Sequence, residues 1–187
     1  VVNITVAAGL LTPPPSTRPP ARSIWALTAE GALVLIKADG TAVSVASTGA
    51  APLPAALLAE STAQGAVLVE RAGRSAALHW LECGDALHCS VMKTATLPLA
   101  DESAPECLAV DPLHGTAFVG TSAGLFVGDG AKKQLTRQAV PAAGTAVTSL
   151  SFSSGALAVG TASAVFQCQL QPGGVSLCLC LCLCVCR

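Results

Sequence analysis

Histidine and cysteine, two residue types that bind Zn²⁺, gather between positions 79 and 89. His79, Cys83, His88 and Cys89 fall in two β-prone runs separated by Gly84-Asp85, which predicts a hairpin with a two-residue turn. In that register His79, Cys83 and His88 share a face while Cys89 lies on the other, a flat ladder unlike a tetrahedral site. We therefore predict buried free thiols, a solvent-facing histidine and no metal site.

The same register also bears on disulfide formation. With a two-residue turn, Cys83 and Cys89 lie on opposite faces of the hairpin, so we expect no disulfide between them unless the loop is about five residues long. Without such a disulfide the sequence supplies no argument for an oxidising compartment, and we assign no localisation.

Ser122 lies in Gly120-Thr-Ser-Ala-Gly124, which matches the G-x-S-x-G nucleophile elbow of serine hydrolases. That elbow requires a helix after the serine, but Leu125-Phe-Val-Gly128 is β-prone. All three histidines precede Ser122, whereas the elbow fold places its base after the nucleophile. A similar segment, Gly160-Thr-Ala-Ser-Ala164, lacks the pattern. We therefore predict a turn here, with no catalytic serine.

The composition favours sheets packed between other sheets. Of 187 residues, 52% are hydrophobic and only 11% are charged, with a formal net charge of -1, whereas soluble domains are about a quarter charged. The near-zero net charge offers no basic field for nucleic acid. There is no uninterrupted apolar run long enough for a membrane-spanning helix. The first residue is Val, and we expect that the chain is part of a longer protein.

The N-terminal segment differs in composition from the rest of the chain. Val1 to Leu11 is apolar and β-prone, and Thr12 to Pro20 is a proline-rich stretch that predicts an extended linker. Asn3-Ile4-Thr5 matches the N-glycosylation acceptor pattern, which short triplets also match by chance. From Ser23 onward, β-prone runs alternate with turn signals, of which Asp39-Gly40 is the clearest hairpin signal. Pro52 to Glu60 is interpreted as a connection that leads into the next strand.

One short motif occurs twice. Ala117-Phe-Val-Gly-Thr-Ser-Ala-Gly-Leu-Phe126 returns as Leu157-Ala-Val-Gly-Thr-Ala-Ser-Ala-Val-Phe166. A related pattern, Gly followed by small and apolar residues, begins at Gly31, Gly65, Gly115 and Gly155, at a mean step of about 41 residues. A four-stranded propeller blade occupies ~40–45 residues.

The chain from about Ser23 to Gly174 resembles β-propeller repeat proteins, in the broad sense of WD-repeat-like and two-component-regulator-type blades. The resemblance depends on these repeats and on the run Val-Gly-Thr-x-x-Gly-Leu-Phe at Val119–Phe126. The expected fold is all-β: a partial β-propeller of about four blade-like units of ~41 residues, preceded by the proline-rich linker. Another all-β fold, such as a sandwich, is the alternative.

The resemblance implies three regions and a function. Residues 1–22 hold the apolar strand and linker, residues 23–174 the propeller-like repeats, and residues 175–187 a Leu-Cys tail. We expect a non-catalytic scaffold domain that binds protein partners, with no cofactor. The alternative is a fragment of a hydrolase-like or lactonase-like propeller enzyme whose channel residues lie mostly outside this chain.

In catalytic and calcium-dependent propellers, Asp, Asn, Glu and His from several blades meet at the central channel. The resemblance therefore suggests a channel role for the segment Asp111-Pro-Leu-His114. Here Asp111 and His114 are candidates, but the corresponding positions in other units hold Glu30 and Ser153-Ser154. A type I turn in which Asp111 caps the chain and Pro112 follows explains the segment. We assign no catalytic, cofactor-binding or metal-binding residue.

The tail alternates strictly between aliphatic residues and cysteine. Its five thiols, Cys178, Cys180, Cys182, Cys184 and Cys186, would lie on one face of a strand. Translation of a short tandem DNA repeat would produce such a pattern, and an aggregation-prone edge strand or a soft-metal array are the other interpretations. The tail is left out of the fold prediction.

Overall fold

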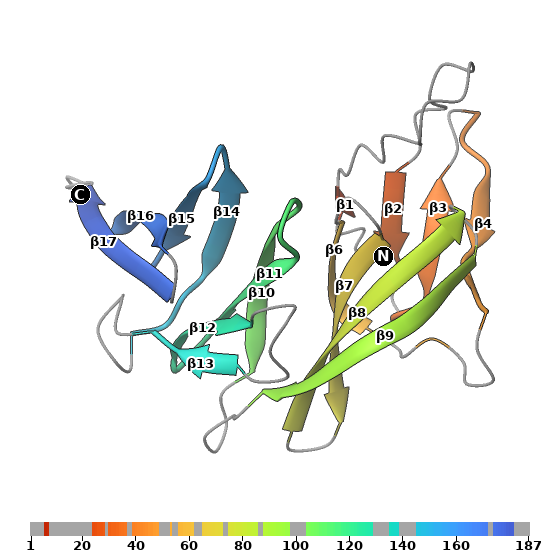
Figure 1. Cartoon of the computed structure of the whole chain (residues 1–187), viewed down its shortest axis with the longest axis horizontal. Helices are drawn as coiled ribbons and strands as arrows, with labels where there is room; N and C mark the ends of the chain where they lie inside the picture. Colours follow the sequence, from red (N-terminus) through yellow and green to blue (C-terminus); the bar gives the residue numbers. More distant parts are fainter. Residues whose placement is uncertain are drawn as a thin grey trace.

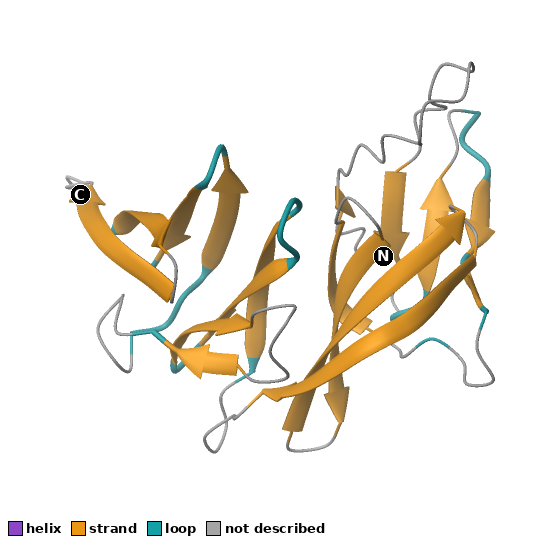
Figure 2. Ribbon diagram, viewed as in Figure 1, coloured by secondary structure: helices purple, strands orange, loops and turns teal. Residues whose placement is uncertain are grey.

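The computed structural model describes residues 6–7, 24–28, 30–36, 39–48, 53, 56–61, 65–72, 75–85, 88–97, 104–128, 135–138, 145–171 and 174–181. All regular structure in these ranges is β-strand, and no helix occurs in them (Figure 2). The prediction of an all-β fold is therefore confirmed. The expectations about Asn3, the proline-rich linker and Cys182 to Cys186 concern residues outside these ranges.

The strands form four sheets that follow one another along the chain (Figure 1). The first sheet contains β1 (Val6–Ala7), β2 (Ile24–Leu27), β3 (Leu33–Ile36) and β4 (Ala42–Ser44). The second contains β6 (Ala56–Ser61), β7 (Gly65–Ala72), β8 (Ser75–Asp85) and β9 (His88–Leu97), with β5 (Ala46–Ser47) at its edge. The third contains β10 (Pro105–Asp111), β11 (Thr116–Thr121), β12 (Gly124–Gly128) and β13 (Leu135–Arg137). The fourth contains β14 (Ser149–Ser153), β15 (Ala156–Gly160), β16 (Val165–Gln171) and β17 (Gly174–Leu181).

Each sheet is built by strands that pair in chain order, so neighbouring strands are antiparallel. The exception is β5, which pairs in parallel with β9. Because β5 directly follows β4 in the chain, this pairing connects the first sheet to the second. The first strands of successive sheets lie next to one another, with β10 between β6 and β14. The sheets are thus packed side by side along the long axis of the molecule (Figure 1).

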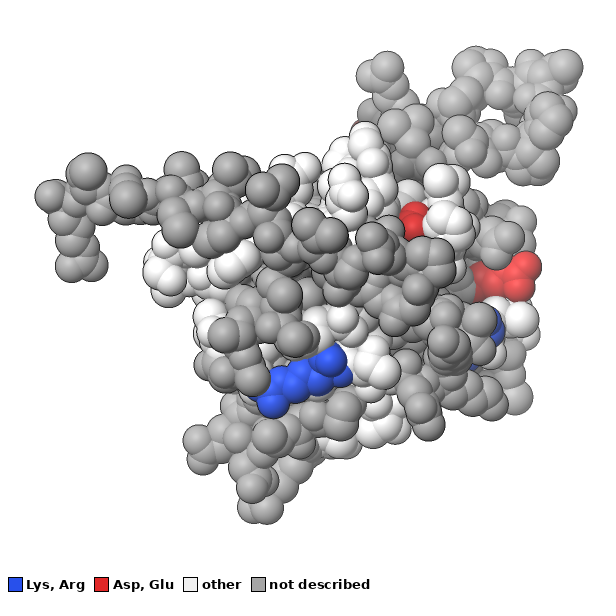
Figure 3. All heavy atoms as spheres, turned by 60° about the vertical axis from the view of Figure 1, so that its left-hand side comes forward, with Lys and Arg blue, Asp and Glu red and all other residues white. Residues whose placement is uncertain are grey.

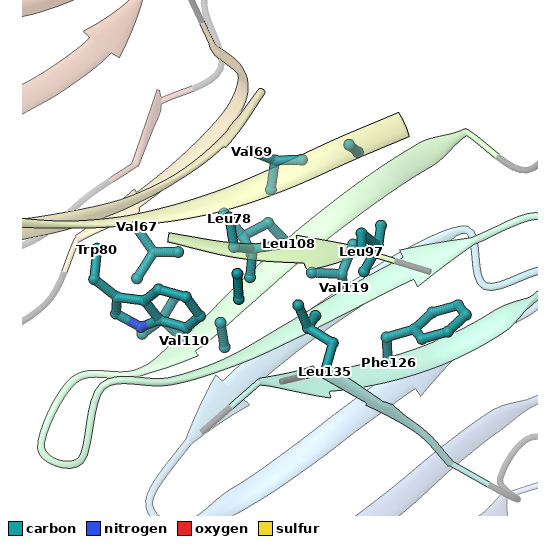
Figure 4. Packing of buried hydrophobic residues seen from close by; sticks show 13 residues of the cluster. Val67, Val69, Leu78, Trp80, Leu97, Leu108, Val110, Val119, Phe126 and Leu135 are labelled. Carbon is teal, nitrogen blue, oxygen red and sulfur yellow. The ribbon is translucent and has the colours of Figure 1, made fainter. Parts of the chain in front are cut away.

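Among the described residues, three hydrophobic cores fill the spaces between successive sheets. The first lies between the first and second sheets and includes Leu35 and Leu68. The second, between the second and third sheets, contains Val69, Leu78, Trp80, Val119 and Phe126 among others (Figure 4). The third joins the third and fourth sheets, where the rings of Phe118 and Phe152 stack with centroids 5.7 Å apart. The low charge content follows from this arrangement, because the middle sheets bury both faces.

Turn chemistry explains where several hairpins form. At Asp39-Gly40 the structure has the predicted turn between β3 and β4: Gly40 has φ 82°, and the Asp39 carboxylate accepts a hydrogen bond from the Thr41 N–H (2.8 Å). Gly31 (φ 81°), Gly115 (φ 66°) and Gly155 (φ 77°) likewise occupy the left-handed region in hairpins. Glycine is the residue that adopts these angles without a steric cost.

The four aligned glycines do not share one position in their sheets. Gly65, Gly115 and Gly155 follow the first strand of the second, third and fourth sheets. Gly31 instead lies between β2 and β3, one hairpin later in the first sheet. The alignment failed there because a glycine with a positive φ is needed at many hairpins, so its presence does not identify which hairpin it is.

Two segments that were not predicted as part of the sheets belong to them. Pro52 to Glu60 was interpreted as a connection, but Ala56–Ser61 is β6, which pairs with β7. Part of the Leu-Cys tail also pairs, since β17 runs alongside β16 as far as Leu181. In both segments, pairing with a neighbouring strand decides the conformation, and the composition of the segment does not indicate that pairing.

Candidate functional site

The β8–β9 hairpin differs from its prediction both in where it turns and in its register, since Leu81 pairs with Val91 and not with His88. β8 continues through Asp85, Asp85 pairs with His88, and an irregularity in the register lies between Cys83 and Asp85. Cys83 therefore lies directly opposite Cys89, with the two Cα atoms 4.0 Å apart, and they form a disulfide. The expectation of no disulfide was wrong, because this β-bulge shifts the register and places both sulfurs on the same face.

His79 does not join the other zinc candidates. Its Nδ1 lies 3.0 Å from Thr94 Oγ1 and its Nε2 lies 2.9 Å from Glu70 Oε2, so the ring connects three adjacent strands. His79 is buried, whereas His88 is exposed and is the solvent-facing histidine. Across the described residues, no group of three or more His, Cys, Asp or Glu side chains is arranged to bind a metal ion.

Ser122 lies in a two-residue hairpin turn between β11 and β12, where Thr121 pairs with Gly124. The buried Thr121 hydroxyl accepts a hydrogen bond from Ala123 N–H (3.1 Å) and donates one to the Gly124 carbonyl (3.1 Å). No helix follows, so the nucleophile-elbow geometry is absent from this segment, as expected.

The second copy of the motif uses its threonine in the same way. Thr161 Oγ1 accepts from Ala164 N–H (3.1 Å) and donates to the Ala164 carbonyl (3.0 Å). The threonine, and not the nearby serine, is the residue that both turns require.

The preceding glycines recur for a steric reason. A Cβ at Gly120 would lie 2.6 Å from Val147 Cγ1 and closer still to Cys107 Sγ. A Cβ at Gly160 would collide with the Ser149 hydroxyl.

Asp111 organises the loop that connects β10 to β11, which we call the 111–115 loop. The Asp111 side chain is 5% exposed, accepts a hydrogen bond from Leu113 N–H (3.0 Å), and lies 2.6 Å from His114 Nδ1. The Asp111 carbonyl accepts from Gly115 N–H (2.8 Å). The prediction of a turn capped by Asp111 is confirmed, but its backbone hydrogen bond joins residues four apart, whereas a type I turn joins residues three apart.

A tryptophan of the neighbouring sheet holds the same loop from the side. Trp80 of β8 packs in the core between the second and third sheets, and its indole N–H donates to the Gly115 carbonyl (2.8 Å). Because Trp80 is itself held by the core, this bond fixes the end of the 111–115 loop relative to two sheets. Nothing in the sequence pointed to this contact, since 35 residues separate the partners.

The 111–115 loop therefore presents two side chains on a rigid base. Leu113 is 82% exposed, the most exposed large hydrophobic residue among those described. The His114 side chain is 76% exposed although its Nδ1 is engaged by Asp111. The tip of the β14–β15 hairpin lies on the same side of the molecule as this loop (Figure 1).

Cys107, a free cysteine of the described core, is poorly suited to act as a nucleophile. Cys107 is a free thiol that donates to the Val147 carbonyl (3.6 Å). Burial, together with the charge of Glu106, raises the pKa of Cys107 to about 11, and a protonated thiol is a weak nucleophile. Cys168 of β16 is disulfide-bonded, and its register partner in β17 is Cys178.

The charged side chains visible in Figure 3 form separate spots and do not merge into a patch of one sign. Within the described residues, no helix is long and apolar enough to cross a membrane.

Comparison with known proteins gives similarity of fold alone. The sequence matches no protein-family model and no curated protein. Among solved structures, the chain is similar to an auxiliary nutrient binding protein from Bacteroides ovatus, with a TM-score of 0.53 and 14% sequence identity. The similarity covers 86% of this chain, which spans 39% of the length of the other.

Proposed function

We propose that this chain is part of a β-propeller-like domain that binds a protein partner through the side bearing the 111–115 loop. The architecture is supported by four antiparallel sheets in chain order, packed face to face, with the first strands of successive sheets adjacent. This is the arrangement that propeller blades adopt around an axis. The chain spans 39% of the similar solved structure, which agrees with a part of a larger domain.

The 111–115 loop is the observation that carries the binding proposal. Loops held by a rigid scaffold are the usual place for binding residues, because the scaffold has already ordered them. Here the Asp111 hydrogen bonds and the Trp80 anchor hold the loop from both ends. The backbone at Leu113 is therefore ordered before binding, so a partner that covers this leucine pays little backbone conformational entropy.

The chemistry of the loop indicates the partner's surface. Leu113 would enter an apolar socket, and the adjacent His114 imidazole would form a hydrogen bond at the rim of that socket. An apolar anchor surrounded by polar contacts is the usual organisation of a protein–protein interface. The Cys83–Cys89 disulfide supports a location in an oxidising compartment, because cytosolic thiols are kept reduced.

A comparison of two matched variants tests the proposal. Leu113→Asp places a charge at the proposed anchor, and Leu57→Asp places the same charge on β6, at a leucine that is 47% exposed. Each protein is immobilised, incubated with an extract of the source cells, and the retained proteins are quantified by mass spectrometry. We expect a partner that the native chain and Leu57→Asp retain and that Leu113→Asp loses by about tenfold or more.

Circular dichroism of both variants must match that of the native chain for the comparison to count. Equal retention of every protein by native chain and Leu113→Asp would refute the role of the loop.

A further inference from the structure

β17 is the last strand of the fourth sheet, where it pairs with β16 (Figure 1). In this ladder Cys178 lies opposite Cys168, and Cys180 lies opposite Phe166. Cys168 is disulfide-bonded, and Cys178 is the cysteine that the register places against it. Residues directly opposite each other in a ladder share a face and are close enough to be bridged.

The sequence of β17 fits this register and also the register two residues away. From Leu177 to Cys186 every second residue is cysteine, and the residues between are leucine or valine. A slip of one residue would exchange the two faces of the strand, whereas a slip of two again places a cysteine against Cys168. No residue from 138 to 186 is charged, so charged side chains of this segment cannot fix one register.

The β16–β17 hairpin already contains extra length of the kind that a slip needs. Near its turn Gln169 pairs with Ser176, whereas the next pair outward joins Cys168 to Cys178. Leu177 is therefore an extra residue on β17, as in a β-bulge. Two further residues in this bulge would leave the pairs beside the turn in place and would bring Cys180 opposite Cys168.

We propose that Cys168 exchanges its disulfide between Cys178 and Cys180, and that β17 slides along β16 by two residues when it does so. The Cys180 thiolate attacks Cys168 Sγ, the bond between Cys168 and Cys178 breaks, and Cys178 leaves as a thiolate that takes up a proton. One disulfide is broken and one is formed, so the step needs no oxidant or reductant. The slide is about 6.8 Å, at ~3.4 Å per residue.

The two strands set the balance between the two forms. β16 contains one cysteine, so it holds one tail cysteine at a time. The bond to Cys178 joins residues 10 positions apart and the bond to Cys180 joins residues 12 apart, which by loop-closure entropy alone disfavours the second form about 1.3-fold. The larger bulge disfavours it further. We therefore expect the Cys178 form in excess and the Cys180 form in a measurable fraction.

Disulfide mapping of the full chain tests the proposal. The protein is held at pH 8.5, its thiols are blocked with N-ethylmaleimide, and it is digested with pepsin at acidic pH, where exchange stops. Tandem mass spectrometry should find Cys168 bonded to Cys178 in most molecules and to Cys180 in about a tenth or more. The Cys178 form, isolated by reversed-phase chromatography in acid, should regenerate the Cys180 form at pH 8.5, but not once its thiols are blocked.

Two matched variants separate a slide from a detached tail. In Cys178→Ser, Cys168 should be bonded to Cys180, and the backbone amides of β16 should keep their protection from hydrogen exchange because β17 still pairs with it. In the control, Cys180→Ser, the bond should stay at Cys178.

A native chain with the Cys178 bond alone overturns the proposal, as does an isolated Cys178 form that regenerates nothing or that changes after its thiols are blocked. A free Cys168 in Cys178→Ser overturns it too. So does loss of β16 protection in that variant, or bonding spread equally over Cys180 and the later tail cysteines, since either result would show that β17 has detached.

Discussion

Replacement of Cys83 and Cys89 by alanine is the sharpest test of the β8–β9 hairpin. The disulfide joins residues separated by 6 positions and closes the hairpin directly beside its turn. Its removal enlarges the conformational freedom of the unfolded chain but leaves the strand pairing available to the folded one. The double variant is therefore expected to fold with a lower free energy of unfolding.

The magnitude follows from the loop length and the burial of one sulfur. Closing a loop of about seven residues corresponds to roughly 2 kcal/mol at 25 °C in the chain-entropy description. Cys89 is wholly buried beside the core between the first two sheets, so its truncation adds about 1 kcal/mol of lost packing. We expect a total loss of about 3 kcal/mol.

Urea unfolding followed by circular dichroism measures this loss, and the double variant is preferred to a reducing agent because Cys168 is also disulfide-bonded. Cys107→Ala removes one partly buried free thiol without a cross-link and should cost about 1 kcal/mol or less.

Equal stability of the double variant and Cys107→Ala would refute the reasoning. So would alkylation of both Cys83 and Cys89 in the denatured, unreduced native protein, detected by mass spectrometry, because it would show that the two thiols are free.

Further predictions concern the twin motif and the buried thiol. Gly120→Ala should destabilise the chain by about 1–3 kcal/mol in urea unfolding, because its Cβ would enter a packed core, and Gly160→Ala should cost less because a rotatable hydroxyl is the obstacle. Thr121→Val should cost about 1–3 kcal/mol because a wholly buried side chain loses both hydrogen bonds, and Thr161→Val should cost less because Thr161 is only partly buried. Since burial raises the pKa of Cys107 to about 11, its alkylation by iodoacetamide should rise about tenfold per pH unit and level off only near that pH. A rate that levels near pH 9 would contradict it.

Local turn chemistry explains which parts of the fold were predictable. Asp39-Gly40 and the Gly-Thr turns could be located because the residues that require a positive φ, or that bond to their own backbone, lie within a few positions of one another. The turn role of Asp111 was predictable for the same reason. The continuous apolar runs at Leu33–Ile36 and within Thr116–Val119 likewise indicated strands.

The candidate site was less accessible to prediction. The strand continues through Gly84-Asp85, the predicted turn, and a β-bulge then shifts the register without a marked change in composition, so the pairing of Cys83 with Cys89 was missed. His79 was correctly placed in a strand, but its partners Glu70 and Thr94 come from two other strands. The bond from Trp80 to Gly115 joins different sheets. Such contacts depend on how sheets pack.

The amino-acid sequence by itself determined that this chain forms strands, because the period of its apolar residues and the residues at its turns act over distances of a few positions. It also determined that the strands are covered, because too few charges are present for exposed sheets. Only the tertiary structure decided which faces meet, which hairpin holds the disulfide, and that Leu113 is exposed on an anchored loop. The Gly-Thr motif shows the division: the threonine serves its own turn, while the glycine is required by side chains from elsewhere in the chain.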